Sequence, residues 1–175
     1  MSRPTVLVTG GCGYIGSHVI RHLSEIDAKV IVIDNLVTGF RENLLHGEKL
    51  IEANVGDSAV LDRIFTEHRV DAVIHFAAAL VVPESVRDPI KYYSNNTFNT
   101  LKLLEAVTRH KVPRFIFSST AAVYGAPREM PVKETTHLEP MSPYGSSKLM
   151  TEIMLRDTAL AHDFNYVALR YFNVA

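Results

Sequence analysis

Short apolar runs alternate with longer amphipathic segments along most of this chain, and that alternation restricts the possible folds more than any other feature. The short runs are rich in β-branched residues, and several are apolar almost throughout, as strands are when helices cover both faces of a sheet. Six strands are predicted, at residues 5–9, 30–34, 49–53, 72–76, 114–118 and 166–171.

The segments between these strands have helical periodicity. In the first, Ile15, Val19, Leu23 and Ile26 recur every three or four residues and define one buried stripe. Three more helices are predicted, at residues 58–68, 95–110 and 143–162, with Asp57 as an N-cap of the first of these. Because such alternation produces right-handed β-α-β units, we predict an α/β fold: a doubly wound parallel sheet of about six strands with helices on both faces.

Composition excludes several classes of function. The 175 residues match the size of one domain, and the formal net charge of -1 gives no electrostatic reason to expect nucleic acid or a membrane surface as a partner. The single cysteine, Cys12, rules out an internal disulfide and favours the reducing cytoplasm. No apolar run is long enough to span a membrane, and the histidines lack the spacing of metal ligands, so no metal site is predicted.

A glycine-rich segment, T-G-G-C-G-Y-I-G at residues 9–16, follows the first predicted strand and opens the first predicted helix. Gly11, Gly13 and Gly16 satisfy the pattern G-x-G-x-x-G, and Gly10 extends it to a second overlapping pattern. Glycines allow a tight turn and a close approach of the backbone to a pyrophosphate, while the helix N-terminus offers free N–H groups to the phosphates. The segment therefore predicts dinucleotide binding of the Rossmann type.

An acidic residue, Asp34, ends the second predicted strand about 20 residues further on, where a carboxylate can accept hydrogen bonds from an adenosine ribose. Asn35 and Leu36 follow it, with no arginine immediately there to neutralise a 2′-phosphate. This arrangement favours NAD over NADP, although Arg41 lies close enough in sequence to leave NADP open.

Tyr144 and Lys148 are four residues apart near the start of the last predicted helix, so their side chains share one face. A nearby ammonium, together with a positive nicotinamide ring, would lower the pKa of the phenol from about 10 toward neutrality. Y-x-x-x-K is common by chance, but Ser118, Ser119 and Thr120 follow the fifth predicted strand at the edge where ligands bind parallel sheets. Thr120 could therefore hold a substrate hydroxyl beside Tyr144.

These residues resemble UDP-glucose (UDP-galactose) 4-epimerases of the extended short-chain dehydrogenase/reductase family, in order along essentially the whole chain. The matching motifs are T-G-G-C-G-Y-I-G-S-H (9–18), D-N-L-V-T-G (34–39), I-H-F-A-A (74–78), E-S-V-R-D-P (84–89), Y-Y-S-N-N (92–96), F-S-S-T-A-A-V-Y-G (117–125), S-P-Y-G-S-S-K-L-M-T-E (142–152) and R-Y-F-N-V (170–174). The resemblance implies an enzyme of galactose metabolism that interconverts UDP-glucose and UDP-galactose.

The resemblance also implies a mechanism and its residues. Tyr144 would take the proton from the sugar 4-hydroxyl while hydride passes from C4 to bound NAD, Lys148 would be its electrostatic partner, and Thr120 would share its hydrogen bond. The 4-keto sugar would then turn in the pocket, and hydride would return to its other face. The implied cofactor-binding residues are Gly10, Gly13, Tyr14, Ile15, Gly16, Asp34, Asn35, Thr38, Gly39, Asn54, Val55, Phe76, Ala77, Ala78, Leu80, Asn95, Ser118, Tyr144, Lys148 and Tyr171, and the implied substrate contacts are Thr120, Tyr144, Phe172 and Asn173.

Sugar-nucleotide 4,6-dehydratases are similar to this chain but need an additional acid–base pair after the strand-end hydroxyl. Ala121 and Ala122 occupy those positions here and cannot move a proton, which favours epimerisation. A non-enzymatic redox-sensing protein of the same fold is disfavoured, because such proteins often lack the tyrosine–lysine pair.

Related epimerases continue for roughly another domain, on the order of 150 residues by ordinary domain sizes, which holds most uridine and diphosphate contacts. Residues 1–175 are therefore predicted to form an NAD-binding Rossmann domain without its C-terminal substrate domain. The alternative to an active enzyme is a chain that binds NAD weakly and turns over UDP-galactose poorly or not at all. By resemblance, a homodimer is expected through the helix bearing Tyr144 and the helix before it.

Overall fold

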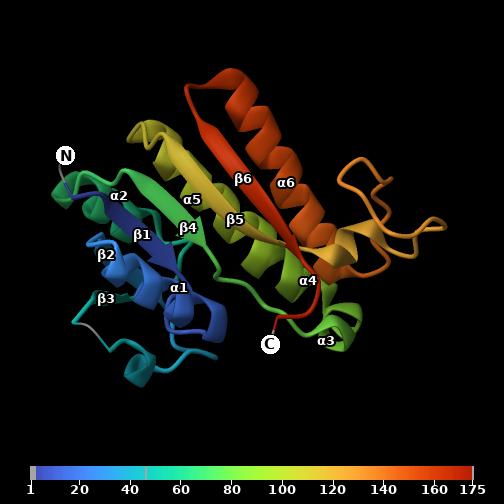
Figure 1. Ribbon diagram of the computed structural model, residues 1–175, viewed down its shortest axis with the longest axis horizontal. Coiled ribbons are helices and arrows are strands. Elements are labelled where there is room, and N and C mark those ends of the chain that lie inside the picture. The colour runs from blue at the N-terminus through green and yellow to red at the C-terminus, as the bar shows by residue number, and fades with distance from the viewer. Residues whose placement is uncertain (1–2, 46, 175) are drawn as a thin grey trace.

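The computed structural model describes residues 3–45 and 47–174. Within them, the strands form one parallel sheet in the order β3-β2-β1-β4-β5-β6, and the predicted α/β fold is confirmed (Figure 1). Each strand lies within two residues of its predicted bounds. The strands are β1 Thr5–Thr9, β2 Lys29–Asp34, β3 Lys49–Glu52, β4 Ala72–His75, β5 Arg114–Thr120 and β6 Asn165–Tyr171.

The direction of strand addition reverses once, at β1. Val8 of β1 is paired with Val32 of β2 on one side and with Ile74 of β4 on the other. Strands β2 and β3 lie on one side of β1. The chain then crosses to the other side of β1, where β4, β5 and β6 follow in order. In open parallel sheets, this reversal leaves a crevice beyond the carboxyl ends of the two strands, and ligands bind there.

Helices cover the two faces of the sheet unequally. α1 (Tyr14–Glu25) packs on one face, and α2 (Ser58–Glu67), α5 (Asn99–Arg109) and α6 (Pro143–Ala161) pack on the other. The alternation of side chains along β1 explains both cores, because Val8 packs in the cluster with Ile20 of α1, whereas Leu7 packs in the cluster with Leu61 of α2 and Leu103 of α5.

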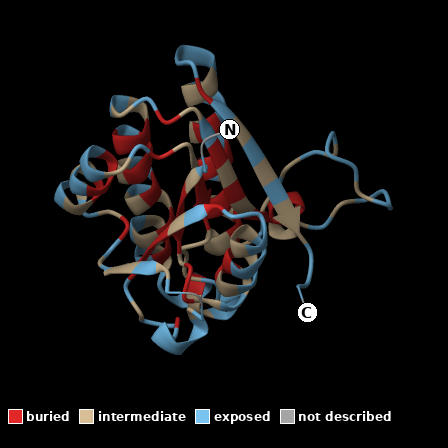
Figure 2. Ribbon diagram, turned by 60° about the vertical axis from the view of Figure 1, so that its left-hand side comes forward, coloured by how far each residue is buried: buried red, intermediate tan, exposed pale blue. Residues whose placement is uncertain are grey.

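The edge strand β6 is covered on one face alone in the described part of the chain. Tyr166 and Ala168 pack against the core beneath α5 and α6. Val167 and Leu169 point the other way and are 53% and 38% exposed. In Figure 2, the strand that leads toward the C label accordingly alternates between pale blue and tan.

Several short helices were not predicted from the sequence. They are the 3-10 helices η1 (Arg41–Asn43) and η3 (Ala121–Tyr124), the α-helices α3 (Val82–Arg87) and α4 (Pro89–Tyr92), and the π-helix η2 (Tyr93–Phe98). Pro83 and Pro89 each lie in a first helical turn, where the missing N–H costs nothing. The helix predicted at residues 95–110 begins within the π-helix η2 and continues as α5.

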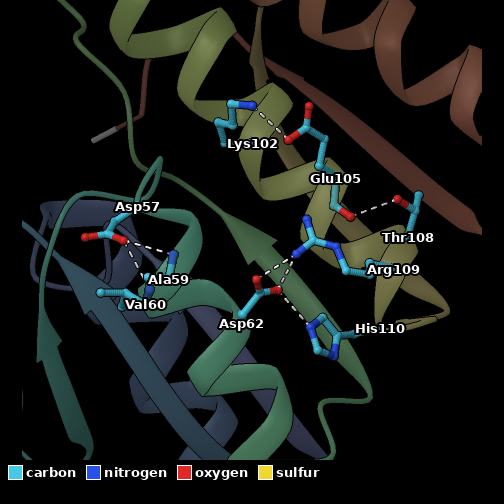
Figure 3. A network of polar contacts seen from close by, with 9 residues as sticks. All are labelled: Asp57, Ala59, Val60, Asp62, Lys102, Glu105, Thr108, Arg109 and His110. Carbon is cyan, nitrogen blue, oxygen red and sulfur yellow. Dashed lines mark hydrogen bonds and ion pairs between the residues drawn. The ribbon is translucent and has the colours of Figure 1, made fainter.

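Polar contacts join α2 to α5 on the shared face (Figure 3). The Asp57 side chain caps α2 by accepting from the backbone N–H groups of Ala59 and Val60, which confirms the predicted N-cap. The Asp62 carboxylate accepts two hydrogen bonds from Arg109, at 2.7 and 2.6 Å, and lies 2.9 Å from Nε2 of His110. These partners, His110 first, lower the pKa of Asp62.

Two kinds of feature are absent from residues 3–45 and 47–174. No helix there is long and apolar enough to cross a membrane. No three histidine, cysteine, aspartate or glutamate side chains there are grouped so that they could hold a metal ion.

Candidate functional site

A pocket of about 670 Å³ opens at the carboxyl ends of β1, β2 and β4, where the strand order reverses. All but three of the predicted cofactor-binding residues line it. Those that do are Gly10, Gly13, Tyr14, Ile15, Gly16, Asp34, Asn35, Thr38, Gly39, Asn54, Val55, Phe76, Ala77, Ala78, Leu80, Asn95 and Ser118. The three that do not are Tyr144, Lys148 and Tyr171.

The glycine loop between β1 and α1 is shaped so closely that side chains would not fit at two of its positions. Gly10 has a φ of 69°, and a Cβ there would lie 2.6 Å from the backbone nitrogen of Ala77. A Cβ on Gly16 would overlap the carbonyl oxygen of Gly10. The loop therefore presents bare backbone at the N-terminus of α1, where free N–H groups favour a phosphate.

We expect Gly10→Ala to disturb both the loop and ligand binding. Alanine at a positive φ costs about 1–3 kcal/mol of strain, and here its methyl group also collides with the backbone at Ala77. Thermal unfolding should show the loss of stability, and nucleotide affinity should fall by at least about tenfold, since about 1.4 kcal/mol corresponds to a factor of ten. Gly47→Ala is the matched control, because Gly47 has a φ of 74° and no atom within 4 Å of an added Cβ. Equal nucleotide affinities for the two variants would contradict the assignment of the loop.

Asp34 holds the glycine loop against the end of β2. Its Oδ2 accepts a hydrogen bond from the backbone N–H of Cys12 and its Oδ1 one from Leu36, both at 2.9 Å. Each carboxylate oxygen can accept more than one hydrogen bond, so the side chain can also bind a hydroxyl in the pocket that it lines. Arg41 forms an ion pair with Glu52 and does not line the pocket.

A buried chain of hydrogen bonds supports the opposite wall of the pocket. The N–H of Ala77 donates to Oγ1 of Thr9 at 3.3 Å, and that hydroxyl lies 2.6 Å from Nδ1 of His75. On the far side, Nε2 of His75 lies 2.8 Å from Thr100, whose hydroxyl donates to the carbonyl of Asn96. Burial lowers the pKa of His75 to about 3, so the ring is neutral and its role is structural.

Asn96 in the π-helix η2 ties this wall to α6. Its Oδ1 accepts from the backbone N–H of Ala79 at 2.8 Å, and its Nδ2 donates to the Ala79 carbonyl at 3.0 Å and to Ser147 Oγ at 3.1 Å. The pocket wall and the helix that carries Tyr144 and Lys148 are thus held in one register. π-helical turns are often found at functional sites.

Thr120, Tyr144 and Lys148 meet where β5 ends and α6 begins. Ser142 caps α6 by accepting from the N–H of Gly145. The Lys148 ammonium is almost wholly buried, donates to the carbonyl of Ser118 at 2.8 Å and lies 4.9 Å from the Phe117 ring centroid. Because Ser118 lines the pocket, Lys148 is directly behind its wall.

Burial shifts the pKa values of two members of this trio. It lowers the pKa of Lys148 to about 7. It also raises the pKa of the Tyr144 phenol, and a hydrogen bond with Thr120 opposes that rise. The expected lowering of the phenol pKa requires the positive nicotinamide ring as well as the ammonium, so it stays a prediction for the chain with its cofactor bound.

The predicted substrate contacts after β6 lie elsewhere in the structure. Phe172 lines a second cavity of about 570 Å³, together with Tyr124, Glu152 and Arg170. Arg170 is fixed there by an ion pair with Glu152 at 2.7 Å. Tyr171 and Asn173 line neither cavity, while Val174, which was not predicted, lines the large pocket.

The sequence also missed two charged residues of the large pocket, Glu84 and Lys91. The signal that could have predicted them is their opposite charge on either side of Asp88 and Pro89. Their ion pair joins α3 to α4.

Comparisons with known proteins agree with this geometry. A family model described as the NAD dependent epimerase/dehydratase family matches residues 6–175. A UDP-glucose 4-epimerase of Azospirillum brasilense is 53% identical over 98% of this chain and 49% of its own length. A probable UDP-arabinose 4-epimerase 3 of Arabidopsis thaliana is 47% identical over 97% of this chain and 43% of its own length.

Solved structures match equally well. The crystal structure of UDP-glucose 4-epimerase from Brucella ovis in complex with NAD superimposes with a TM-score of 0.94 at 43% identity. The match covers 97% of this chain and 52% of that one. The chain thus spans about half the length of the relatives that it matches.

Proposed function

Since this chain belongs to the NAD-dependent epimerase/dehydratase family, we propose that its large pocket binds NAD. The observation that carries the proposal is the bare glycine loop at the N-terminus of α1, with the Asp34 carboxylate anchoring it at the edge of the same pocket. The relative from Brucella ovis, which superimposes on nearly the whole chain, is described as a complex with NAD.

We propose the following placement of the dinucleotide along the pocket. Asp34 would accept hydrogen bonds from the adenosine ribose, and Asn54 and Val55 would border the adenine. The diphosphate would lie over Gly10 and the turn that follows it, where backbone N–H groups are available. The nicotinamide end would then reach toward Ser118 and Lys148.

We propose that the chemistry is the 4-epimerisation of a UDP-hexose, UDP-glucose and UDP-galactose first. Bound NAD would accept a hydride from the sugar C4 and return it. Tyr144 would take the 4-hydroxyl proton, Thr120 would hold the same hydroxyl, and Lys148 would set the electrostatics around both. Ala121 and Ala122 offer no acid or base next to Thr120, which supports epimerisation over dehydration.

The affinity of the chain for NAD tests the first part of this proposal. Calorimetric titration should give one site per chain, and NAD should bind at least about tenfold more tightly than NADP. The Asp34 carboxylate would repel a 2′-phosphate, and Arg41 is already paired with Glu52. Tighter binding of NADP, or no binding of either, would contradict the assignment.

A second candidate is a chain that binds NAD without turning over sugar. It is favoured by the observation that Tyr144 and Lys148 do not line the large pocket. A coupled assay with UDP-galactose separates the two: rates of the order usual for enzymes, about 1–1000 per second, support an active epimerase, whereas NAD binding without turnover supports the second candidate.

We also propose a homodimer and a cytoplasmic location. Apolar side chains are exposed on the neighbouring helices η2, α5 and α6: Phe98 is 54% exposed, Leu101 39%, Met150 43% and Ile153 41%. A second copy would cover them, because apolar side chains grouped on a surface favour association. Sedimentation equilibrium at twice the chain mass would support the dimer, and a single chain mass would contradict it.

A further inference from the structure

The charged side chains that line the large pocket do not complement the negative diphosphate of a dinucleotide unless one of them changes its ion-pair partner. Among the described residues that line it, Lys91 is the one basic side chain, and Asp34 and Glu84 are acidic. The diphosphate of NAD would add two negative charges. Backbone N–H groups of the glycine loop offset part of that charge, but the acidic side chains oppose it.

Lys91 is held at the pocket by a partner that it can leave. Its ammonium donates to Oε1 of Glu84 at 2.6 Å, and the two side chains are 49% and 33% exposed. An ion pair that is this accessible to water contributes at most about 1 kcal/mol. The four methylene groups of lysine allow the ammonium to move by several ångströms without any change in α4, whose first turn is fixed because Asp88 caps the N–H of Lys91.

Glu84 would keep a partner after Lys91 moved. Its Oε2 accepts from the Tyr92 hydroxyl at 2.8 Å, and the Tyr92 side chain is wholly buried. The same hydroxyl also lies 2.7 Å from the carbonyl of Val81, which fixes the ring from a second direction. The Glu84 carboxylate therefore keeps its hydrogen bond to Tyr92, while the Lys91 ammonium can turn from Glu84 toward the pocket.

We propose that Lys91 is the cation that binds the diphosphate of the dinucleotide, and that Glu84 holds its ammonium at the pocket until the ligand arrives. This inference rests on the proposed binding of NAD. A phosphate oxygen accepts a charge-assisted hydrogen bond from lysine more strongly than a neutral group would. Ligand binding thus replaces one exposed ion pair with a contact inside the pocket.

The test is the affinity of four proteins for NAD and for adenosine, measured at low and at high salt. Lys91→Met should bind NAD about tenfold more weakly than the unsubstituted chain at low salt, and that difference should shrink as salt screens the contact. Glu84→Gln should bind NAD as tightly or more tightly, because it removes a negative charge from the pocket and releases the lysine. Lys49→Met is the control: it also removes one exposed, paired lysine, but Lys49 lies on β3 and does not line the pocket.

Each outcome has one meaning. Weaker NAD binding by Lys91→Met, with adenosine binding unchanged, supports the inference, because adenosine has no phosphate. The inference is overturned if Lys91→Met matches Lys49→Met, if it loses adenosine and NAD equally, or if Glu84→Gln weakens NAD binding as much as Lys91→Met does. Failure of the unsubstituted chain to bind NAD would instead remove the proposed function, and this inference with it.

Discussion

Lys148→Met is expected to unfold at higher denaturant concentration than the unsubstituted chain at pH 6. The Lys148 ammonium is buried, and burial lowers its pKa from 10.5 to about 7. At about 1.4 kcal/mol per pKa unit, the charged form costs on the order of 5 kcal/mol in the folded state, and the loss of the hydrogen bond to Ser118 offsets about 1 kcal/mol of the gain from removing it. We therefore expect a gain on the order of 4 kcal/mol.

The same substitution should remove a pH dependence of stability. Between pH 7 and about 10.5 the unfolded chain binds a proton at Lys148 that the folded chain has released, so the stability of the unsubstituted chain rises with pH in this window. Below pH 7 the penalty is fully present. Urea unfolding at pH 6, 8 and 10 should show the difference between the two proteins shrinking as pH rises. Lys102→Met, which removes a more exposed lysine, should show no such trend. A difference in the free energy of unfolding that does not change with pH would contradict a buried ammonium at Lys148.

A costly buried charge at this position suggests that it serves binding or catalysis. Buried ionisable groups with strongly shifted pKa values cluster at functional sites. Lys148→Met should accordingly bind NAD more weakly even though its fold is more stable. If Lys148→Met is more stable and binds NAD as tightly as the unsubstituted chain, Lys148 takes no part in NAD binding.

Tyr144→Phe is expected to slow the reduction of bound NAD by UDP-glucose by about 10²–10⁴-fold, the usual contribution of a positioned acid or base. Phenylalanine keeps the ring, which packs edge-on against Tyr92 with the centroids 6.5 Å apart, so the fold should be preserved. A single-turnover experiment that follows the near-ultraviolet absorbance of reduced nicotinamide measures the step directly.

The pH profile of that step adds a second readout. Burial raises the pKa of Tyr144, so the rate should still be rising with pH at neutrality as the phenolate forms. Thr120→Val should remove the hydrogen bond that opposes this rise and move the profile to higher pH. An unchanged rate in Tyr144→Phe would exclude the phenol as the base, and no reduction by the unsubstituted chain would favour a chain that binds NAD without turning over sugar.

Local patterns were sufficient to predict the sheet. In β1, Leu7 and Val8 are both apolar and buried although they face opposite sides of the sheet, and this signal depends on near neighbours in the sequence. The glycine loop was also predicted from its pattern. A side chain at Gly16 is excluded by the turn itself, whereas a side chain at Gly10 is excluded by Ala77 from a distant segment. The hydrogen bond from Cys12 to Asp34, which joins residues 22 apart, was not predicted, although the place of Asp34 at the end of the second strand was.

Contacts between distant segments could not be predicted. The pairing of Lys91 with Glu84 depends on two short helices, α3 and α4, that were not predicted. The pKa of Tyr144 and of Lys148 depends on how deeply α6 packs against β5, which no spacing reveals. Helical spacing placed the phenol and the ammonium on one face, but it did not show that burial would dominate their electrostatics.

The most direct test of the central claim is a crystal structure of this chain with NAD. We predict that the diphosphate lies over the turn from Gly10 to Gly16, that the adenosine ribose contacts Asp34, and that the nicotinamide ring lies beside the hydroxyl of Tyr144. Dinucleotide bound outside this pocket, or a nicotinamide ring directed away from Tyr144, would contradict the account.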